Sequence, residues 1–166
     1  MMEKTLIAVI IFLSFTINLS AQNSSKDTEI KKELIGVWQA SPVVASGMND
    51  NFQFFADGKY KFNYNQMNGE KRIFSHAGKW KIENGKLIIT LETLKFLIGG
   101  KTEKATGSTA TDFDITGGNV LEKKILPAEK IELSLDNFIK EELHNTTKID
   151  GVKYWKLSSD PTTYEN

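Results

Sequence analysis

Residues 51–93 constrain the fold most strongly, because apolar alternation and turn signals recur there at short spacing. Asp57–Gly58 and Asn84–Gly85 each separate two apolar runs, and Asx-Gly between such runs is the strongest short-range signal of a β-hairpin with a type I′ turn. Asn68–Gly69 repeats this chemistry in a longer connection. The stretch therefore predicts four consecutive antiparallel strands.

The aromatic side chains of these strands share one face. Side chains alternate along a strand, so Tyr60, Phe62 and Tyr64 lie opposite Lys59 and Lys61. The next strand repeats the pattern, with Phe74, His76, Gly78, Trp80 and Ile82 on one face. Glycine in mid-strand predicts a bulge or sharp bend. Bent, aromatic-lined strands in sequence favour an all-β fold, a single antiparallel up-and-down β-barrel of about eight to nine strands.

The rest of the chain adds further strands with clear turn signals. Residues 94–98 and 101–105 flank Gly99–Gly100 and predict a hairpin, and Asp150–Gly151 precedes a closing strand over 152–157. Between them, strand character recurs over 111–116, 120–126 and 130–135, with a turn at Pro127. Residues 136–143 fit a helix or a continued strand.

The chain begins with a segment of signal-peptide form. Residues 1–21 combine a short charged start with an apolar run and a small residue at the end, which predicts export. We expect a flexible lead-in over 22–31, one domain over 32–158 and a disordered tail over 159–166. No cysteine occurs, so no lipidated cysteine follows the signal and the exported protein is expected to be soluble. A cysteine-free exported domain suits a bacterial periplasm or extracellular space.

Charge argues against two classes of partner. The chain has 21 basic and 21 acidic residues and is formally neutral at pH 7. A nucleic-acid-binding domain carries a basic stripe, and a membrane-surface protein carries a polybasic patch. We therefore expect no nucleic-acid partner, and no membrane span after removal of the signal segment.

A short motif then suggests a family. Gly36-Val37-Trp38 opens the first strand and is followed by the meander, and this arrangement resembles the lipocalin or calycin signature. The chain resembles bacterial lipocalin-like domains over residues 32–158. The resemblance implies an eight-stranded barrel in which Trp38 plugs one end and Gly36 allows close approach beside it. The other conserved lipocalin motifs have no counterpart here.

Searching for catalytic and metal-binding patterns gives no candidate. There is no Gly-x-Ser-x-Gly motif, and the two histidines, His76 and His144, have no nameable partner. Residues 112–117 begin like a calcium loop, but Lys123 occupies its twelfth position, where a bidentate glutamate is required. We therefore expect a non-enzymatic protein with no metal or cofactor.

Aromatic density supplies the remaining hypothesis. An aromatic-lined interior is the default site for a small apolar or amphipathic ligand, although the same side chains could form a filled core. A filled core favours a protein-binding or inhibitory module that acts on another exported protein through its loops. The candidate ligand-binding residues are Trp38, Phe54, Tyr60, Phe62, Tyr64, Arg72, Phe74, His76 and Trp80. The 41–50 loop, with Val43, Val44 and Met48, is either a lid or a loop packed on the barrel wall.

Overall fold

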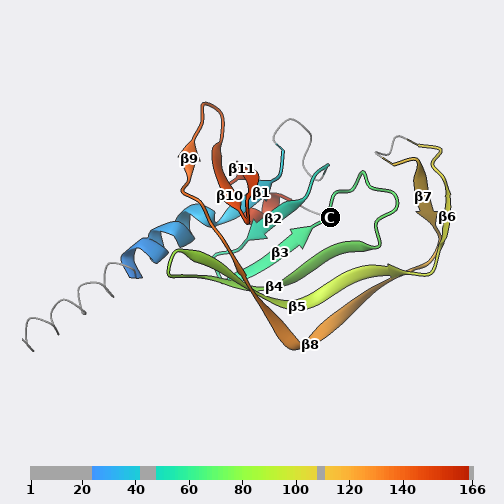
Figure 1. Cartoon of the computed structure of the whole chain (residues 1–166), viewed down its shortest axis with the longest axis horizontal. Coiled ribbons are helices and arrows are strands. Elements are labelled where there is room, and N and C mark those ends of the chain that lie inside the picture. Colours follow the sequence, from blue (N-terminus) through green and yellow to red (C-terminus); the bar gives the residue numbers. More distant parts are fainter. Residues whose placement is uncertain (1–23, 42–47, 108–110, 165–166) are drawn as a thin grey trace, which may run out of the picture.

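The computed structural model describes residues 24–41, 48–107 and 111–164 (Figure 1). Its main feature is a nine-stranded antiparallel sheet in the order β8-β5-β4-β3-β2-β1-β11-β10-β9. The strands are β1 (Gly36–Gln39), β2 (Asn51–Phe54), β3 (Lys59–Asn63), β4 (Ile73–Glu83), β5 (Lys86–Ile98), β8 (Asn119–Leu133), β9 (Ile139–Lys140), β10 (Asn145–Ile149) and β11 (Val152–Ser158). The predicted antiparallel all-β fold is confirmed, including the closing strand, which pairs with β1.

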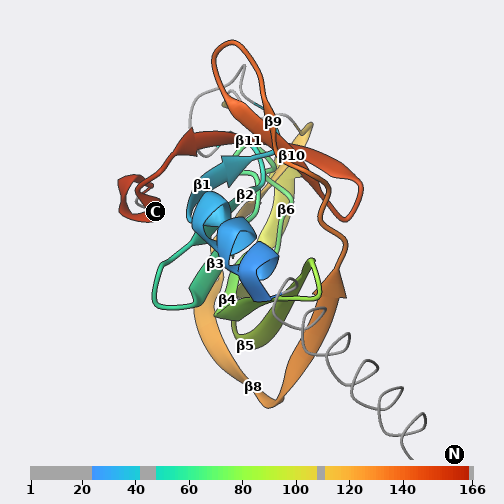
Figure 2. The same cartoon turned by 90° about the vertical axis from the view of Figure 1, so that its left-hand side faces the viewer.

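The segment that follows β8 meets β10 at one short bridge. Leu135, just after β8, forms an isolated antiparallel bridge with Ile149 of β10. The Asp136 amide donates to the Lys148 carbonyl at 3.0 Å, and the Asp150 amide donates to the Ser134 carbonyl at 2.9 Å. Seen from the helix end, the strands surround a central region behind the N-terminal helix (Figure 2). Neighbours in the sheet follow one another in the chain except at two places: β5 pairs with β8 across the β6–β7 insertion, and β1 pairs with β11.

The backbone angles test the predicted turns one by one. Asn84 and Gly85 have φ of 54° and 76°, and Asp150 and Gly151 have φ of 50° and 78°, as a type I′ turn requires. At 57–58 the hairpin forms, but only Gly58 has a positive φ, and its amide donates to the Phe55 carbonyl at 3.1 Å. The expectation of a type I′ turn there was wrong, because the loop from 55 to 58 is longer than two residues.

A hairpin of its own, β6 (Lys101–Lys104) with β7 (Phe113–Thr116), corrects the prediction for residues 94–105. β5 pairs with β8 across this insertion, so Gly99–Gly100 leads out of the main sheet instead of folding β6 back onto β5. At Pro127 the chain does not turn into a separate strand, since β8 runs through it, but the pairing with β5 is interrupted over 125–128 and β8 bends sharply (Figure 1). Residues 125–128 have no partners on β5, so the missing proline N–H costs the ladder no hydrogen bond. Residues 136–143 contain the short strand β9 and no helix.

The lead-in expected to be flexible is helical from residue 24 to residue 34. The carboxylate of Asp27 accepts hydrogen bonds from the Asn84 and Gly85 amides, at 2.9 and 2.8 Å, and Leu34 is fully buried in the core. The polar composition suggested disorder. The helix is instead held against the β4–β5 turn, because its Asp27 satisfies two backbone amides of that turn. At its C-terminal end the Leu34 carbonyl accepts from Trp38 Nε1 at 2.7 Å.

The first strand starts at a close approach between two backbones. Gly36 has φ of 133°, and a Cβ there would lie 2.2 Å from the Ser158 carbonyl oxygen on β11. Only glycine fits this conformation and this spacing. Trp38, two residues later, is buried at 0% exposure, with its ring 5.6 Å from that of Phe138.

The tail expected to be disordered packs against the sheet. It forms a short 3-10 helix, η1 (Pro161–Thr163), and Tyr164 is buried. Gln53 Nε2 donates to the carbonyls of Pro161 and Tyr164, at 2.8 and 2.9 Å. The tail is ordered because the buried Gln53 side chain, which points away from the aromatic core, needs hydrogen-bond acceptors, and the tail carbonyls provide them.

We expect Tyr164→Ala to lower the free energy of unfolding by about 1–3 kcal/mol. The substitution removes a buried ring and exposes the Gln53 side-chain amide beside it to water. Urea unfolding followed by tryptophan fluorescence measures the change. Thr163→Ala, at an exposed neighbouring position, is the control and should change stability by less than about 0.5 kcal/mol. Equal stability of the two variants would contradict the packed tail.

The predicted irregularity at Gly78 is confirmed as a β-bulge. The β4–β5 register shifts between Ala77 and Gly78, so that Glu92 of β5 has no partner on β4. A Cβ on Gly78 would lie 1.9 Å from the Thr90 carbonyl oxygen and 3.0 Å from the Glu92 amide nitrogen. Both neighbours are backbone atoms, so a side chain at position 78 would force the strands apart.

Gly78→Ala is therefore expected to destabilise the fold by about 1–3 kcal/mol through this overlap. The midpoint of urea unfolding, compared with that of the unaltered chain, gives the effect. Gly107→Ala is the matched control, because a Cβ there meets nothing within 4 Å and no positive φ is involved. A Gly78→Ala chain as stable as the control would show that the bulge relaxes at no cost.

Candidate functional site

Five of the nine predicted ligand-binding residues lie in the packed core. Trp38, Phe54, Tyr60, Phe62 and Trp80 are at most 8% exposed. Their rings contact one another, as in the Phe54–Trp80 pair with centroids 5.1 Å apart. Side chains this deeply buried have almost no surface in contact with solvent or with an internal void, so a ligand could not contact them without moving them. The aromatic face therefore supplies packing at these positions.

His76 belongs to the edge of the same aromatic cluster. Its ring stacks on Phe62 with centroids 4.9 Å apart, and its Nδ1 lies 3.1 Å from the Tyr60 hydroxyl. Burial lowers the pKa of His76 to about 4 and raises the pKa of Tyr60. Both groups are therefore neutral near pH 7, and their contact is a hydrogen bond between uncharged side chains.

The depressed pKa of His76 predicts a loss of stability in mild acid. Between its ordinary pKa of 6.5 and about 4, the unfolded chain binds a proton that the folded chain does not, so the free energy of unfolding falls as the pH falls. We expect His76 to contribute about 1–2 kcal/mol to the loss between about pH 7 and about pH 5. Urea unfolding at both pH values measures it.

The test compares His76→Phe, which keeps a ring beside Phe62, with His144→Asn, in the β9–β10 loop. His76→Phe should show a smaller difference in stability between the two pH values, and His144→Asn should keep the full difference. The prediction fails if His76→Phe retains the pH dependence of the unaltered chain.

The remaining predicted site residues lie outside the core. Arg72 is exposed, and its Nη1 donates to the Gly99 carbonyl at 2.8 Å. Met48 is 42% exposed, whereas Val43 and Val44 lie outside the described residues, so the lid prediction stays untested. Tyr64 and Phe74 line one cavity, and Tyr60 lines another along β3 and β4.

The cavity lined by Tyr64 and Phe74, which we term the lysine cavity, has a volume of about 510 Å³. It lies where β3, β4 and β5 meet the 64–72 loop and the start of β8. Three of its lining residues are lysines, and the others are polar, aromatic or aliphatic. The lining residues are Lys61, Tyr64, Gln66, Lys71, Phe74, Ser75, Lys95 and Val120. The cavity therefore offers positive charge beside apolar surface.

Strand register builds this site. Ser75 of β4 pairs with Asn63 of β3 on one side and with Lys95 of β5 on the other. Lys61 is two residues before Asn63, so its side chain leaves the same face of the sheet. The β4 register also shifts between Ile73 and Ser75, which leaves Phe74 unpaired at the rim. The aromatic core lies on the opposite face.

Burial distinguishes two of the three lysines from an ordinary surface lysine. Burial, reinforced by repulsion from Lys95, lowers the pKa of Lys61. Burial also lowers the pKa of Lys71. Lys71 Nζ donates to the Asn65 carbonyl at 2.7 Å and to the Tyr64 carbonyl at 3.4 Å, and lies 5.4 Å from the centre of the Phe74 ring.

The alternation of apolar and polar residues along the strand predicted that Lys61 lies on a solvated face. It gave no reason to group Lys61 with Lys71 and Lys95. The signal that could have found them is cross-strand register, which depends on the bulges near Phe74 and Gly78. Lysine on the polar phase of a strand is otherwise an ordinary surface residue.

Two other cavities are less suited to a ligand. One, of about 500 Å³, separates the N-terminal helix from the β4–β5 turn, and its Asp27 already binds that turn. The other, of about 440 Å³, lies along β3 and β4, and its Lys79 and Glu92 form an ion pair at 3.4 Å. In both, the carboxylates are paired within the protein, and the second cavity shares only Lys61 with the lysine cavity.

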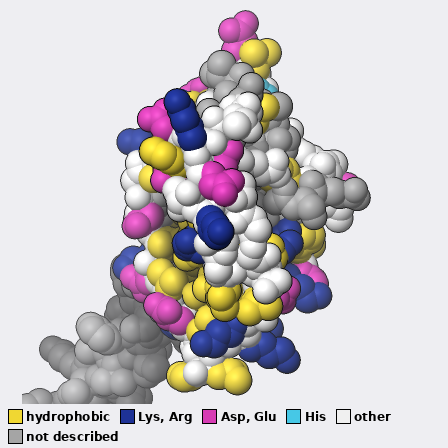
Figure 3. Space-filling model, turned by 90° about the vertical axis from the view of Figure 1, so that its right-hand side faces the viewer, with side chains coloured by type: hydrophobic (Ala, Val, Ile, Leu, Met, Phe, Trp, Pro, Cys, Tyr) yellow, Lys and Arg dark blue, Asp and Glu magenta, His cyan; other side chains and the backbone are white. Residues whose placement is uncertain are grey.

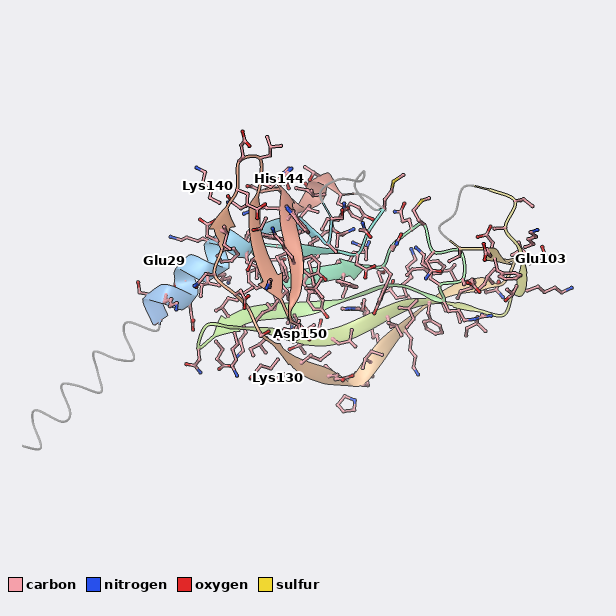
Figure 4. The ribbon with its side chains drawn as sticks, turned by 45° about the horizontal axis from the view of Figure 1, so that its top comes forward. Glu29, Glu103, Lys130, Lys140, His144 and Asp150 are labelled. Carbon is pink, nitrogen blue, oxygen red and sulfur yellow. The ribbon has the colours of Figure 1, made fainter. Side chains whose placement is uncertain are left out.

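Side chains that could bind a metal ion do not gather in the described ranges. Across the described residues, no group of three or more histidine, aspartate or glutamate side chains could hold a metal ion. Figure 4 places His144 in the β9–β10 hairpin, at a different end of the molecule from Glu103 in β6. None of the helices in the described ranges has both the length and the apolar character needed to cross a membrane.

Comparison with known proteins does not add to this geometry: no family model, curated protein or solved structure matches the chain. The lipocalin-like resemblance therefore rests on the Gly36–Trp38 motif and the meander. The lysine cavity is the site that the geometry supports best.

Proposed function

We propose that this chain is an exported, non-enzymatic, lipocalin-like barrel that binds a small amphipathic ligand. The observation that carries the proposal is the lysine cavity, with a volume of about 510 Å³ and both charged and apolar lining residues. Small-molecule sites commonly have volumes of about 300–1,000 Å³, with apolar walls and a few polar groups. The ligand lies at this cavity and not among the aromatic side chains of the interior.

The barrel and the export are parts of the same proposal. The Leu135–Ile149 bridge and the pairing of β11 with β1 support a sheet that closes on itself. The signal-peptide form of residues 1–21, which lie outside the described residues, supports export to a periplasm or extracellular space.

A second candidate function uses a different surface. β5, β8 and the β6–β7 hairpin form an extension that projects away from the N-terminal helix (Figure 1), and hydrophobic side chains gather on its outer end among basic and acidic side chains (Figure 3). Ile98, Phe113 and Leu121 are large hydrophobic residues exposed there. With a packed core, this surface favours an exported protein partner that binds the extension.

The ligand proposal predicts a bound molecule that one substitution removes. Native mass spectrometry of the mature chain, purified from its own producer, should show an added mass that is lost under denaturing conditions. Val120→Trp should abolish this mass by filling the cavity, since Val120 lines it and is 51% exposed, which makes misfolding a small risk. Val152→Trp, at a position 50% exposed on β11, is the matched control and should retain it.

An added mass that survives Val120→Trp would place the ligand elsewhere and contradict the proposed site. A spectrum without added mass, together with no binding of the probes described below, would favour the extension surface and a protein partner.

A further inference from the structure

We infer that the lysine cavity takes an organic anion with an apolar body, of which an alkyl carboxylate is the simplest representative. The inference rests on the proposed function, that this cavity holds a small ligand. It adds the chemical class of the ligand, which neither the sequence pattern nor the comparisons indicate.

Three lysines bring positive charge to the cavity. Lys61 on β3, Lys95 on β5 and Lys71 in the connecting loop reach the cavity from three separate segments. The ion pairs of the described residues involve other lysines, and none of these three forms one. Lys59 and Lys79, their neighbours on β3 and β4, are by contrast paired with Asp57 and Glu92.

Placing these lysines close together is electrostatically unfavourable. Lys95 repels Lys61, and burial removes part of the water that would stabilise the Lys61 ammonium group. Glu122, which pairs with Lys95 across β5 and β8, is outside the cavity lining and only partly offsets this effect on Lys61. An anion in the cavity would relieve the repulsion, so binding gains free energy from a preformed site.

The arrangement of the lining residues would orient a bound ligand. Lys71 Nζ uses two of its three N–H groups on the Tyr64 and Asn65 carbonyls, which leaves one N–H for a ligand. Phe74 and Val120 supply the apolar part of the lining. A ligand can therefore set its anionic group against the ammonium groups and its apolar body against Phe74 and Val120.

Three probes separate the contributions of charge and body: decanoate, 1-decanol with the same body but no charge, and acetate with the charge but almost no body. Isothermal titration calorimetry on the mature chain should detect decanoate, with 1-decanol and acetate at least about tenfold weaker. Raising NaCl from about 0.05 M to about 0.5 M should weaken decanoate binding, since salt screens the lysines.

Two charge-removing variants assign the effect to the cavity. Lys61→Gln and Lys95→Gln should each weaken decanoate binding by about fivefold to tenfold, because each removes an ammonium group and keeps a side chain of similar length. Lys101→Gln is the matched control, since Lys101 is exposed on β6 and outside the lining. Urea unfolding of each variant confirms that the fold is retained.

Two results would overturn the inference while leaving the proposed function in place. The first is 1-decanol binding as tightly as decanoate, and the second is unchanged decanoate affinity in both Lys61→Gln and Lys95→Gln. Failure of decanoate to bind at all also rejects the anionic class. The co-purified mass and its loss in Val120→Trp then decide separately whether the cavity holds any small ligand.

Discussion

Phe52 holds the centre on which the rest of this fold depends. Its ring lies 5.1 Å from that of Phe54 on the same strand, 4.5 Å from Phe62 on β3 and 5.4 Å from Tyr154 on β11. Tight packing among aromatic rings leaves no room for a ligand at these positions, because displaced rings would have to find new partners. Binding is therefore directed to the lysine cavity, where lysines lie beside Tyr64 and Phe74 at the margin of the core.

Sequence reasoning succeeded where the signal is local. The Asn84–Gly85 turn, the bulge at Gly78 and the alternation of aromatic and lysine residues on β3 all follow from steric rules that act over a few residues. The identity of the core face followed as well, although its aromatic side chains were equally compatible with a pocket. Packing density, which decides between these two outcomes, depends on contacts from distant strands.

The misses share a different cause. The pairing of β5 with β8, the docked tail and the lysine cavity all depend on segments that are not neighbours in the chain. Gln53 and its two acceptor carbonyls are more than 100 residues apart, and no periodicity links them. Composition was similarly uninformative about charge, since formal neutrality of the whole chain coexists with three unpaired lysines at one cavity. Only the register of strands, set partly by bulges, brings such residues together.

The irregularities near Gly78 lie on one line across the sheet. Glu92 is unpaired with respect to both β4 and β8, and residues 125–128 of β8 lie opposite it. This line separates the packed core from the extension formed by the outer parts of β5 and β8 with the β6–β7 hairpin. Past it the ladders continue, but most side chains of β8 are exposed and belong to no core. Replacing the β6–β7 hairpin would therefore disturb no core packing, but it would remove the hydrogen bond from the Ile115 amide to the Gly69 carbonyl, at 2.9 Å, in the loop that lines the lysine cavity. Divergence in this hairpin would change the cavity while leaving the core intact.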